Sequence, residues 1–225
     1  AMGRAFPELQ MVSFTLGGIT ATPMAMIDDK GNGATFDTIS NQWTEKLARA
    51  LTIQMGGSAM VSLYPVTAKE CKKYLIKNSL SLIHYIGCVV KEHSFNAYQV
   101  LAKELKGKHL FQARVRDVER TAGEGFTRGV VKLEGIGDFA GRNVKLDFQN
   151  EFLIAMEGDK VLASTPDLIC LFDANTGEPV TTEVMKYGLS VNVLGLPCDP
   201  IWRSKEAIDL VGPKYFKYDI EYQPL

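Results

Sequence analysis

The sequence is poor in the features that mark several common classes of protein. It has only 4 cysteines among 225 residues, and none stands in a CxxC or CxxH pair, so neither a zinc motif nor a thioredoxin-like motif is present. The charges nearly cancel, at −1 overall, and the basic excess with which nucleic-acid binders neutralise phosphates is missing. No apolar run approaches the roughly 18–20 residues of a membrane span, and the first residues show no signal-peptide pattern. We therefore expect a cytoplasmic protein with free thiols that binds neither nucleic acid nor a membrane.

The composition is that of a globular protein, with 46% hydrophobic and 23% charged residues. Its length suits two domains, and the pattern changes near residue 107. Residues 1–107 alternate helices and strands and are expected to form an α/β part. The expected elements are a strand over 10–16, hairpin strands over 24–27 and 34–39 around Gly31-Asn32-Gly33, a buried strand over 58–66, and helices over 80–92 and 96–105. Ser40 or Asn41 should cap a further helix, with Trp43, Leu47, Leu51 and Met55 on its apolar face.

Residues 108–225 form the second expected domain, which is mainly β. Short strands are separated by Gly, Asp and Asn turns, and helical periodicity returns only over 205–211. The expected strands cover 110–119, 127–133, 143–151, 152–156, 161–164, 168–172 and 190–196, with a turn at Gly123-Glu124-Gly125 between the first two. Strands of this kind favour a closed barrel or a sandwich. The predicted fold class is thus an α/β layered part followed by an all-β domain.

Motifs for nucleotides and metals are absent or weak. The sequence holds no Walker motif and no Gly-x-Ser-x-Gly elbow. The run Asp28-Asp29-Lys30-Gly31-Asn32-Gly33 resembles the start of a calcium loop, but Ile39 stands where such a loop needs a bidentate glutamate, so a hairpin turn is favoured. His84, Cys88 and Glu92 recur every four residues on one expected helix, where packing explains them better than a metal does. We expect no metal and no cofactor.

Two polar segments are harder to explain by packing alone. In the segment over residues 2–10, Arg4 could hold a carbonyl or carboxylate, and Glu8 could act as an acid or base; the alternative is a surface loop with a local ion pair. In the segment over 195–203, two prolines flank Cys198 and Asp199. Cys198 could be a nucleophile if a cation lowered its pKa, and Asp199 could be a base. The alternative there is a loop with a buried cysteine and Trp202 as a core anchor.

Two further stretches place polar residues where a strand is expected. Gln149, Asn150 and Glu151 lie between two phenylalanines, so at least one of them should face a partner, a cleft or a bulge. Asp167 directly precedes an apolar strand and could cap a turn. Asn150, Glu151 and Asp167 are therefore candidates for binding a substrate, although structural roles are favoured slightly for both stretches.

A series of motifs carries a resemblance to a known family. They are, in order, MGRAFPELQM (2–11), TPMA (22–25), MGGSA (55–59), FQNE (148–151), TPDLI (165–169), TGEPVTTE (176–183), GLPCDPIWR (195–203) and VGPKYF (211–216). The chain resembles, over essentially its whole length, the S-methyl-thiohydantoin desulfurase-like family encoded beside hydantoinase/oxoprolinase genes. Members of that family begin with a glycine-rich segment, whereas this chain opens at what would be an interior motif. The resemblance therefore implies a fragment or a shortened member, with an α/β part to about residue 107 and a β domain after it.

The resemblance implies hydrolysis of a carbon–sulfur bond on a five-membered hydantoin ring, with methanethiol leaving. Such chemistry needs a base for water, a proton donor near the sulfur, and donors for the ring carbonyls. Glu8 and Asp199 are then candidates for proton transfer, Arg4 and Asn150 for ring recognition, and Cys198 for an auxiliary or nucleophilic role. Two alternatives stay open: an accessory subunit of a hydantoinase/oxoprolinase, and a metal-dependent amidohydrolase acting on cyclic amides. A homo-oligomer is expected in either case.

Overall fold

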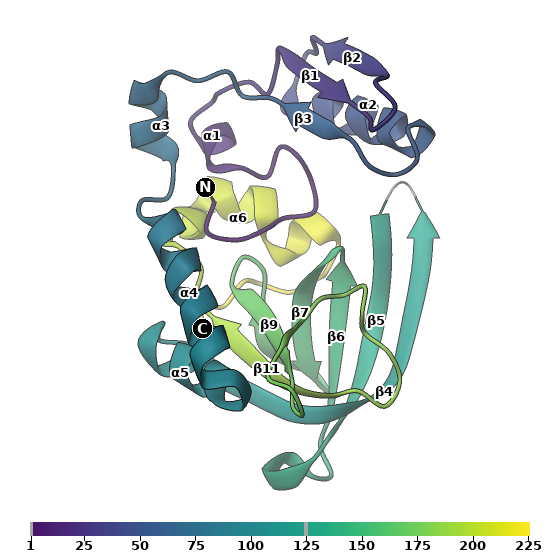
Figure 1. Cartoon of the computed structure of the whole chain (residues 1–225), viewed down its shortest axis with the longest axis vertical. Helices are drawn as coiled ribbons and strands as arrows, with labels where there is room; N and C mark the ends of the chain where they lie inside the picture. The colour runs from purple at the N-terminus through teal and green to yellow at the C-terminus, as the bar shows by residue number, and fades with distance from the viewer. Residues whose placement is uncertain (1, 124–125) are drawn as a thin grey trace. The chain divides into compact units, whose positions relative to one another are not determined.

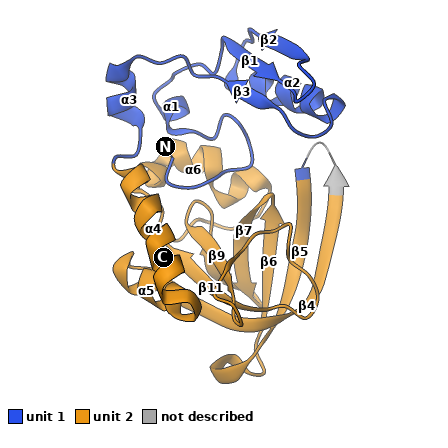
Figure 2. Ribbon diagram, in the orientation of Figure 1, with its two compact units in different colours: residues 1–77, 122–126 blue, residues 78–121, 127–225 orange. Residues whose placement is uncertain are grey.

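The computed structural model describes residues 2–123 and 126–225, so part of the expected turn at Gly123-Glu124-Gly125 lies outside the described residues. The chain divides into two compact units, one of residues 1–77 and 122–126 and the other of residues 78–121 and 127–225 (Figure 2). Each unit combines helices with an antiparallel sheet, which agrees with the mixed α and β class predicted above. The expected boundary at residue 107 stays a prediction.

The first unit contains a three-stranded sheet and one long helix (Figure 1). Its elements are α1 (Ser13–Leu16), β1 (Met24–Ile27), β2 (Gly33–Phe36), α2 (Asn41–Gln54), β3 (Met60–Ser62) and α3 (Ala68–Tyr74). The strand order is β2-β1-β3, and both pairings are antiparallel. Met24 and Met26 of β1 pack with Ala48 of α2 and with Met55 in a small buried cluster. Ser40 caps α2 as predicted, because its side chain accepts a hydrogen bond from the Trp43 backbone N–H.

The predicted hairpin is confirmed, and an aspartate holds its turn. The Asp28 carboxylate accepts hydrogen bonds from the backbone N–H of Lys30 at 2.9 Å and of Asn32 at 2.8 Å, and from the Asn32 amide at 2.7 Å. The Asn32 side chain contributes most to lowering the pKa of Asp28. The run that resembled a calcium loop therefore has a local structural role, in which one carboxylate satisfies the donors of the turn.

Two predictions for this unit are wrong, and a third holds in part. Residues 10–16 form no strand: α1 begins at Ser13, and its turn is closed by local hydrogen bonds such as that from Thr15 N to Val12 O. The strand expected to be buried over 58–66 is short, and all three residues of β3 are exposed. Of the apolar face expected for α2, Met55 is buried and Leu51 packs in the same cluster, but Trp43 and Leu47 are 46% and 43% exposed.

Helix α3 was not predicted, although the sequence carries a signal for it. Thr67 accepts a hydrogen bond from the Glu70 backbone N–H, and the Glu70 side chain accepts one from the Thr67 backbone N–H. This reciprocal arrangement is a capping box, whose pattern is a threonine followed three residues later by a glutamate. The pattern could have located the start of the helix.

The second unit contains an eight-stranded antiparallel sheet with three helices. The helices are α4 (Ser79–His93), α5 (Ala97–Glu104) and α6 (Lys205–Val211), with short 3-10 turns η1 (Ser94–Asn96), η2 (Gly137–Phe139), η3 (Pro200–Arg203) and η4 (Pro213–Phe216). The strands are β4 (Lys108–Gly123), β5 (Phe126–Gly135), β6 (Asn143–Gln149), β7 (Glu151–Glu157), β8 (Lys160–Ser164), β9 (Leu168–Asp173), β10 (Pro179–Val180) and β11 (Ser190–Leu196). The three predicted helices of this part are confirmed within a few residues.

The large sheet curls on itself. Its strand order is β10-β9-β11-β4-β5-β6-β7-β8, so β8 and β9 follow each other in the chain but stand near opposite ends of the sheet. Contacts of β9 with both β7 and β8 bring these ends together around a buried core that includes Phe111, Leu146 and Phe148. Helices α4 and α5 pack on β9 and β11 through a separate apolar cluster (Figure 1). Among the described strands no pairing closes the sheet, so the barrel or sandwich stays a prediction.

Candidate functional site

Asp167 is the centre of a buried polar cluster in the second unit. It follows the cis Thr165-Pro166 peptide between β8 and β9, and its exposed fraction is 0%. Its Oδ1 accepts a hydrogen bond from the backbone N–H of Cys198 at 2.8 Å and lies 3.4 Å from the guanidinium of Arg203. Its Oδ2 accepts hydrogen bonds from the Tyr222 hydroxyl at 3.0 Å and from the Leu225 backbone N–H at 2.9 Å. Both carboxylate oxygens are therefore engaged by protein donors.

The cluster keeps the Cys198 thiol protonated. Burial raises the pKa of Cys198 to about 11, and the negative charge of Asp167 adds to the effect. The guanidinium of Arg203 acts in the opposite direction but is outweighed. Burial also raises the pKa of Tyr222, with further contributions from Cys198 and Asp167. From the sequence, Cys198 was a candidate nucleophile only if a cation lowered its pKa. The pKa is raised instead, so this condition is not met.

A pH dependence of stability follows from this shift. Unfolding returns the thiol to its ordinary pKa of about 8.5, so its contribution to stability is complete below that pH and is lost as the pH rises toward about 11. We expect the free energy of unfolding, measured with urea between pH 8 and pH 10.5, to fall less steeply in C198A than in the wild type. The same slope in C198A and the wild type would contradict the shift, and C71A serves as the matched control, since Cys71 is a half-buried free thiol.

Asp199 and Trp202 have separate structural positions in the segment over 195–203. Asp199 is the N-cap of η3, and its Oδ1 accepts a hydrogen bond from the Ile201 backbone N–H at 3.0 Å. Trp202 is completely buried, which confirms the core anchor considered from the sequence. The segment is thus held at Cys198 by Asp167, at Asp199 by its own cap, and at Trp202 by packing.

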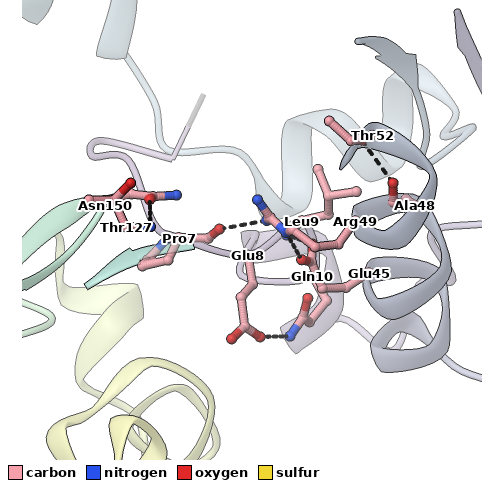
Figure 3. Close-up of polar contacts among 10 residues, drawn as sticks. All are labelled: Pro7, Glu8, Leu9, Gln10, Glu45, Ala48, Arg49, Thr52, Thr127 and Asn150. Carbon is pink, nitrogen blue, oxygen red and sulfur yellow. Dashed lines mark hydrogen bonds and ion pairs between the residues drawn. The ribbon is translucent and has the colours of Figure 1, made fainter. Parts of the chain in front are cut away.

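Asn150 and Glu151 lie at the connection between β6 and β7. Asn150 has a positive φ of 57°, which places it in the left-handed region, where asparagine is tolerated better than most residues. Its Oδ1 accepts a hydrogen bond from the Thr127 backbone N–H at 3.2 Å (Figure 3), and its own N–H donates to the Thr127 carbonyl at 3.0 Å. Glu151 begins β7 opposite Gln149. The predicted strand over 143–151 is therefore interrupted at Asn150, which lies between the end of β6 at Gln149 and the start of β7 at Glu151.

Arg4 and Glu8 belong to the first unit and make local contacts there. The Nε of Arg4 donates to the Ala5 carbonyl at 2.9 Å, and the guanidinium lies 4.3 Å from the centre of the Phe6 ring. The Glu8 carboxylate accepts a hydrogen bond from the Gln10 amide (Figure 3). The roles considered for Arg4 and Glu8 from the sequence stay predictions.

Helix α2 fastens this loop through a buried glutamate. Glu45 is 5% exposed and accepts a hydrogen bond from the Leu9 backbone N–H at 2.8 Å. It also pairs with Arg49 at 2.7 Å, and Arg49 in turn donates to the Pro7 carbonyl at 3.0 Å (Figure 3). A carboxylate and a guanidinium one helical turn apart thereby bind two backbone groups of the loop.

The structure thus brings together two of the residues singled out from the sequence, Asp167 and Cys198, and adds Arg203 and Tyr222 to them. Asp199 is next to this cluster in the chain but is engaged in its cap. Glu8 belongs to the other compact unit, and the roles expected for Glu8, Asp199 and Asn150 in one reaction stay predictions.

Two buried polar residues of β6 were not among the candidate site residues. Asp147 and Gln149 are 5% and 3% exposed. Both interrupt an apolar strand beside Phe148, and Gln149 belongs to the polar stretch over 149–151 that the sequence already marked as irregular. A bulge in the pairing of β6 with β7, between Asp147 and Phe148, agrees with the irregularity expected for this stretch.

Groups suited to a metal are not found in the part of the chain that the structure describes, where no three His, Cys, Asp or Glu side chains come together. His84 and Cys88 do approach each other on α4, with 3.9 Å between Nδ1 and Sγ, without a third ligand type beside them. No helix formed by the described residues is long and apolar enough to span a membrane.

Comparisons with known proteins place the chain in a family. A crystal structure of a protein from Chromobacterium violaceum matches with a TM-score of 0.80 and 20% sequence identity, which shows a shared fold; the match covers 99% of this chain and 64% of that one. No curated protein matches the chain. Residues 1–38 match the family description "S-Me-THD-like, N-terminal domain", and residues 39–225 match "S-Me-THD-like, C-terminal domain". The chain therefore belongs to the S-Me-THD-like family.

Proposed function

We propose that this protein is a hydrolase of hydantoin or thiohydantoin metabolism that releases methanethiol from S-methyl-thiohydantoins. The observation that supports the proposal is the match to both domains of the S-Me-THD-like family. In the reaction, water adds to the ring carbon that carries the S-methyl group and the carbon–sulfur bond breaks. The oxygen of the water stays on the ring carbon as a carbonyl. Of the two protons of the water, one goes to the ring nitrogen and the other leaves with the sulfur as methanethiol.

The residues proposed for this chemistry are those whose side chains can move protons or bind a ring. Glu8 and Asp199 are proposed for proton transfer, and Arg4, Asn150 and Glu151 for holding the ring. Asp167 would act through the segment that it holds, because its oxygens already accept from Cys198, Tyr222 and Leu225. Cys198 is proposed as an auxiliary group in its protonated form.

The direct test is an assay of methanethiol release by the purified full-length protein. Each of E8Q and D199N is expected to lower kcat by about 10²–10⁴-fold if the residue transfers a proton in the rate-limiting step. D138N is the matched control, since Asp138 is exposed on η2. A variant that keeps the wild-type rate removes its residue from the mechanism.

The same assay separates the proposal from its alternatives. A protein that releases no methanethiol but co-purifies with a hydantoinase/oxoprolinase would be an accessory subunit. Turnover of a cyclic amide that depends on a metal found in the purified protein would instead indicate an amidohydrolase. Methanethiol release by the purified protein alone contradicts both alternatives.

A further inference from the structure

The outer face of β5 and β6 carries polar residues where the sheet should meet water. The register places Arg128 opposite Gln149 and Val130 opposite Asp147. Because neighbouring residues of a strand point to opposite faces, these four side chains share the face that is turned away from the core. The core face of the same strands holds Phe148 and its buried neighbours. Solvated polar side chains would be expected on the outer face.

The chain that follows α6 covers one end of this face. Phe216 of η4 and Tyr218 line a cavity of about 320 Å³ together with Arg128, Val130, Asp147 and Gln149. Burial raises the pKa of Tyr218 to about 12, with a further contribution from the charge of Asp147, while Arg128 acts in the opposite direction. Phe216 and Tyr218 thus form part of the wall of a cavity that stays open to solvent, and the two β6 residues that line it, Asp147 and Gln149, are themselves buried.

Two buried polar atoms of this cavity have no hydrogen-bond partner among the described residues. They are Nε2 of Gln149, a donor, and Oδ1 of Asp147, an acceptor. The Lys145 ammonium lies 3.1 Å from Asp147 Oδ1 as an ion pair, which balances charge but does not have the geometry of a hydrogen bond. An unpaired buried donor costs about 1–3 kcal/mol, so a ligand that accepts from Gln149 Nε2 would gain from it, and a ligand N–H could add the hydrogen bond that Asp147 Oδ1 lacks.

A donor and an acceptor two residues apart on one strand face complement an amide group, whose carbonyl accepts and whose N–H donates. Of the other residues that line the cavity, Val130, Phe216 and Tyr218 are apolar or aromatic and suit the faces of a flat ring, while Arg128 adds a positive charge. The volume is at the lower end of that for small-molecule sites, about 300–1,000 Å³, which fits a small ring better than a large ligand.

We propose that this cavity binds the ring of a five-membered cyclic amide, with Gln149 donating to a ring carbonyl and Asp147 accepting from a ring N–H. The choice of a hydantoin-type ring rests on the proposed function, whereas the assignment of the two residues rests on their burial and on the hydrogen bonds that Gln149 Nε2 and Asp147 Oδ1 lack. In this arrangement Gln149 and Asp147 select for an unsubstituted ring amide, and Tyr218 covers the ring.

The test is direct binding of hydantoin to the full-length protein by isothermal titration calorimetry, with 1,3-dimethylhydantoin as the second probe. The dimethyl compound keeps the ring and both carbonyls but has no N–H. We expect hydantoin to bind, and the dimethyl compound to bind at least about tenfold more weakly because Asp147 loses its donor. This comparison uses the wild-type protein and does not depend on the folding of a variant. Equal affinity for the two compounds, or no binding of hydantoin, would overturn the proposal.

Two variants assign the effect to residues. Q149L and D147N are each expected to weaken hydantoin binding at least about tenfold. Q54L and D138N make the same changes at exposed positions and should bind like the wild type. Q149L should also raise the melting temperature of the unliganded protein, because it removes an unsatisfied buried donor. Wild-type affinity in folded Q149L and D147N would place the ring elsewhere.

The ring-binding site and the proposed hydrolase activity can each fail without the other. Hydantoin binding that depends on Gln149 and Asp147, without methanethiol release, would retain the site and reject the hydrolase. Methanethiol release that continues at the wild-type rate and Michaelis constant in Q149L and D147N would retain the hydrolase and reject this site.

Discussion

Replacing Asp167 with alanine is expected to lower the free energy of unfolding by about 3–5 kcal/mol, the usual loss when one member of a buried charged network is removed. The carboxylate is completely buried and accepts from the backbone N–H groups of Cys198 and Leu225 and from the Tyr222 hydroxyl. Each of these donors would lose its partner at a cost of about 1–3 kcal/mol if it stays buried. Arg203 contributes less to the loss of stability, because its side chain is 33% exposed and can be solvated when the carboxylate is removed.

The measurement is urea unfolding at pH 7, followed by circular dichroism, with D138A as the control. Asp138 is exposed on η2, and its removal should change stability by no more than about 0.5 kcal/mol. D167N keeps one acceptor oxygen and should lie between D167A and the wild type. A loss in D167A below about 1 kcal/mol would mean that the four donors find water when the carboxylate is removed, and that the cluster does not hold the chain that follows η4.

Much of the secondary structure could be predicted because it is encoded by short-range chemistry. The hairpin after β1 was found from Gly31-Asn32-Gly33, and α2 was found from the cap at Ser40. Burial was predicted less well, since it depends on what packs against an element. On α2 the regular spacing of Trp43 and Leu47 indicated a buried face, but both side chains are exposed and Ala48 packs on β1 instead.

The candidate site shows the same difference between what local patterns predict and what depends on packing. Asp167 and Cys198 were each singled out from their own segments, but they are 31 residues apart in the chain, and only the fold reveals their hydrogen bond. Asp147 and Gln149 were not chosen as site residues, because strand alternation places them on the outer face, where polar side chains are usually solvated. They line one cavity with Phe216 and Tyr218, which no local pattern connects with β6.

Replacing Trp202 with alanine is expected to cost about 3–5 kcal/mol, as large a loss as that for Asp167 but of a different physical origin. Trp202 has an exposed fraction of 0%, so truncation removes its buried apolar surface and leaves a cavity. The residue lies in η3, directly after the Asp199 cap and next to Arg203 of the Asp167 cluster. Loss of the anchor should therefore also loosen the segment that presents Cys198 to Asp167.

The chain contains a matched control for this prediction, because it has 2 tryptophans and the other is Trp43 on α2. Trp43 is 46% exposed, and its cation–π contact is with Lys46 Nζ at 5.1 Å, so W43A should cost at most about 1 kcal/mol. The two variants also separate the two contributions to tryptophan fluorescence. W43A should show the emission of the buried Trp202, and W202A should show the emission of the exposed Trp43. If W202A were as stable as W43A, or if iodoacetamide labelled Cys198 no faster in W202A than in the wild type, Trp202 would not anchor the segment. Faster labelling of Cys198 in W202A, at a pH where the wild-type thiol stays protonated, would show that the buried indole and the raised thiol pKa depend on the same packing.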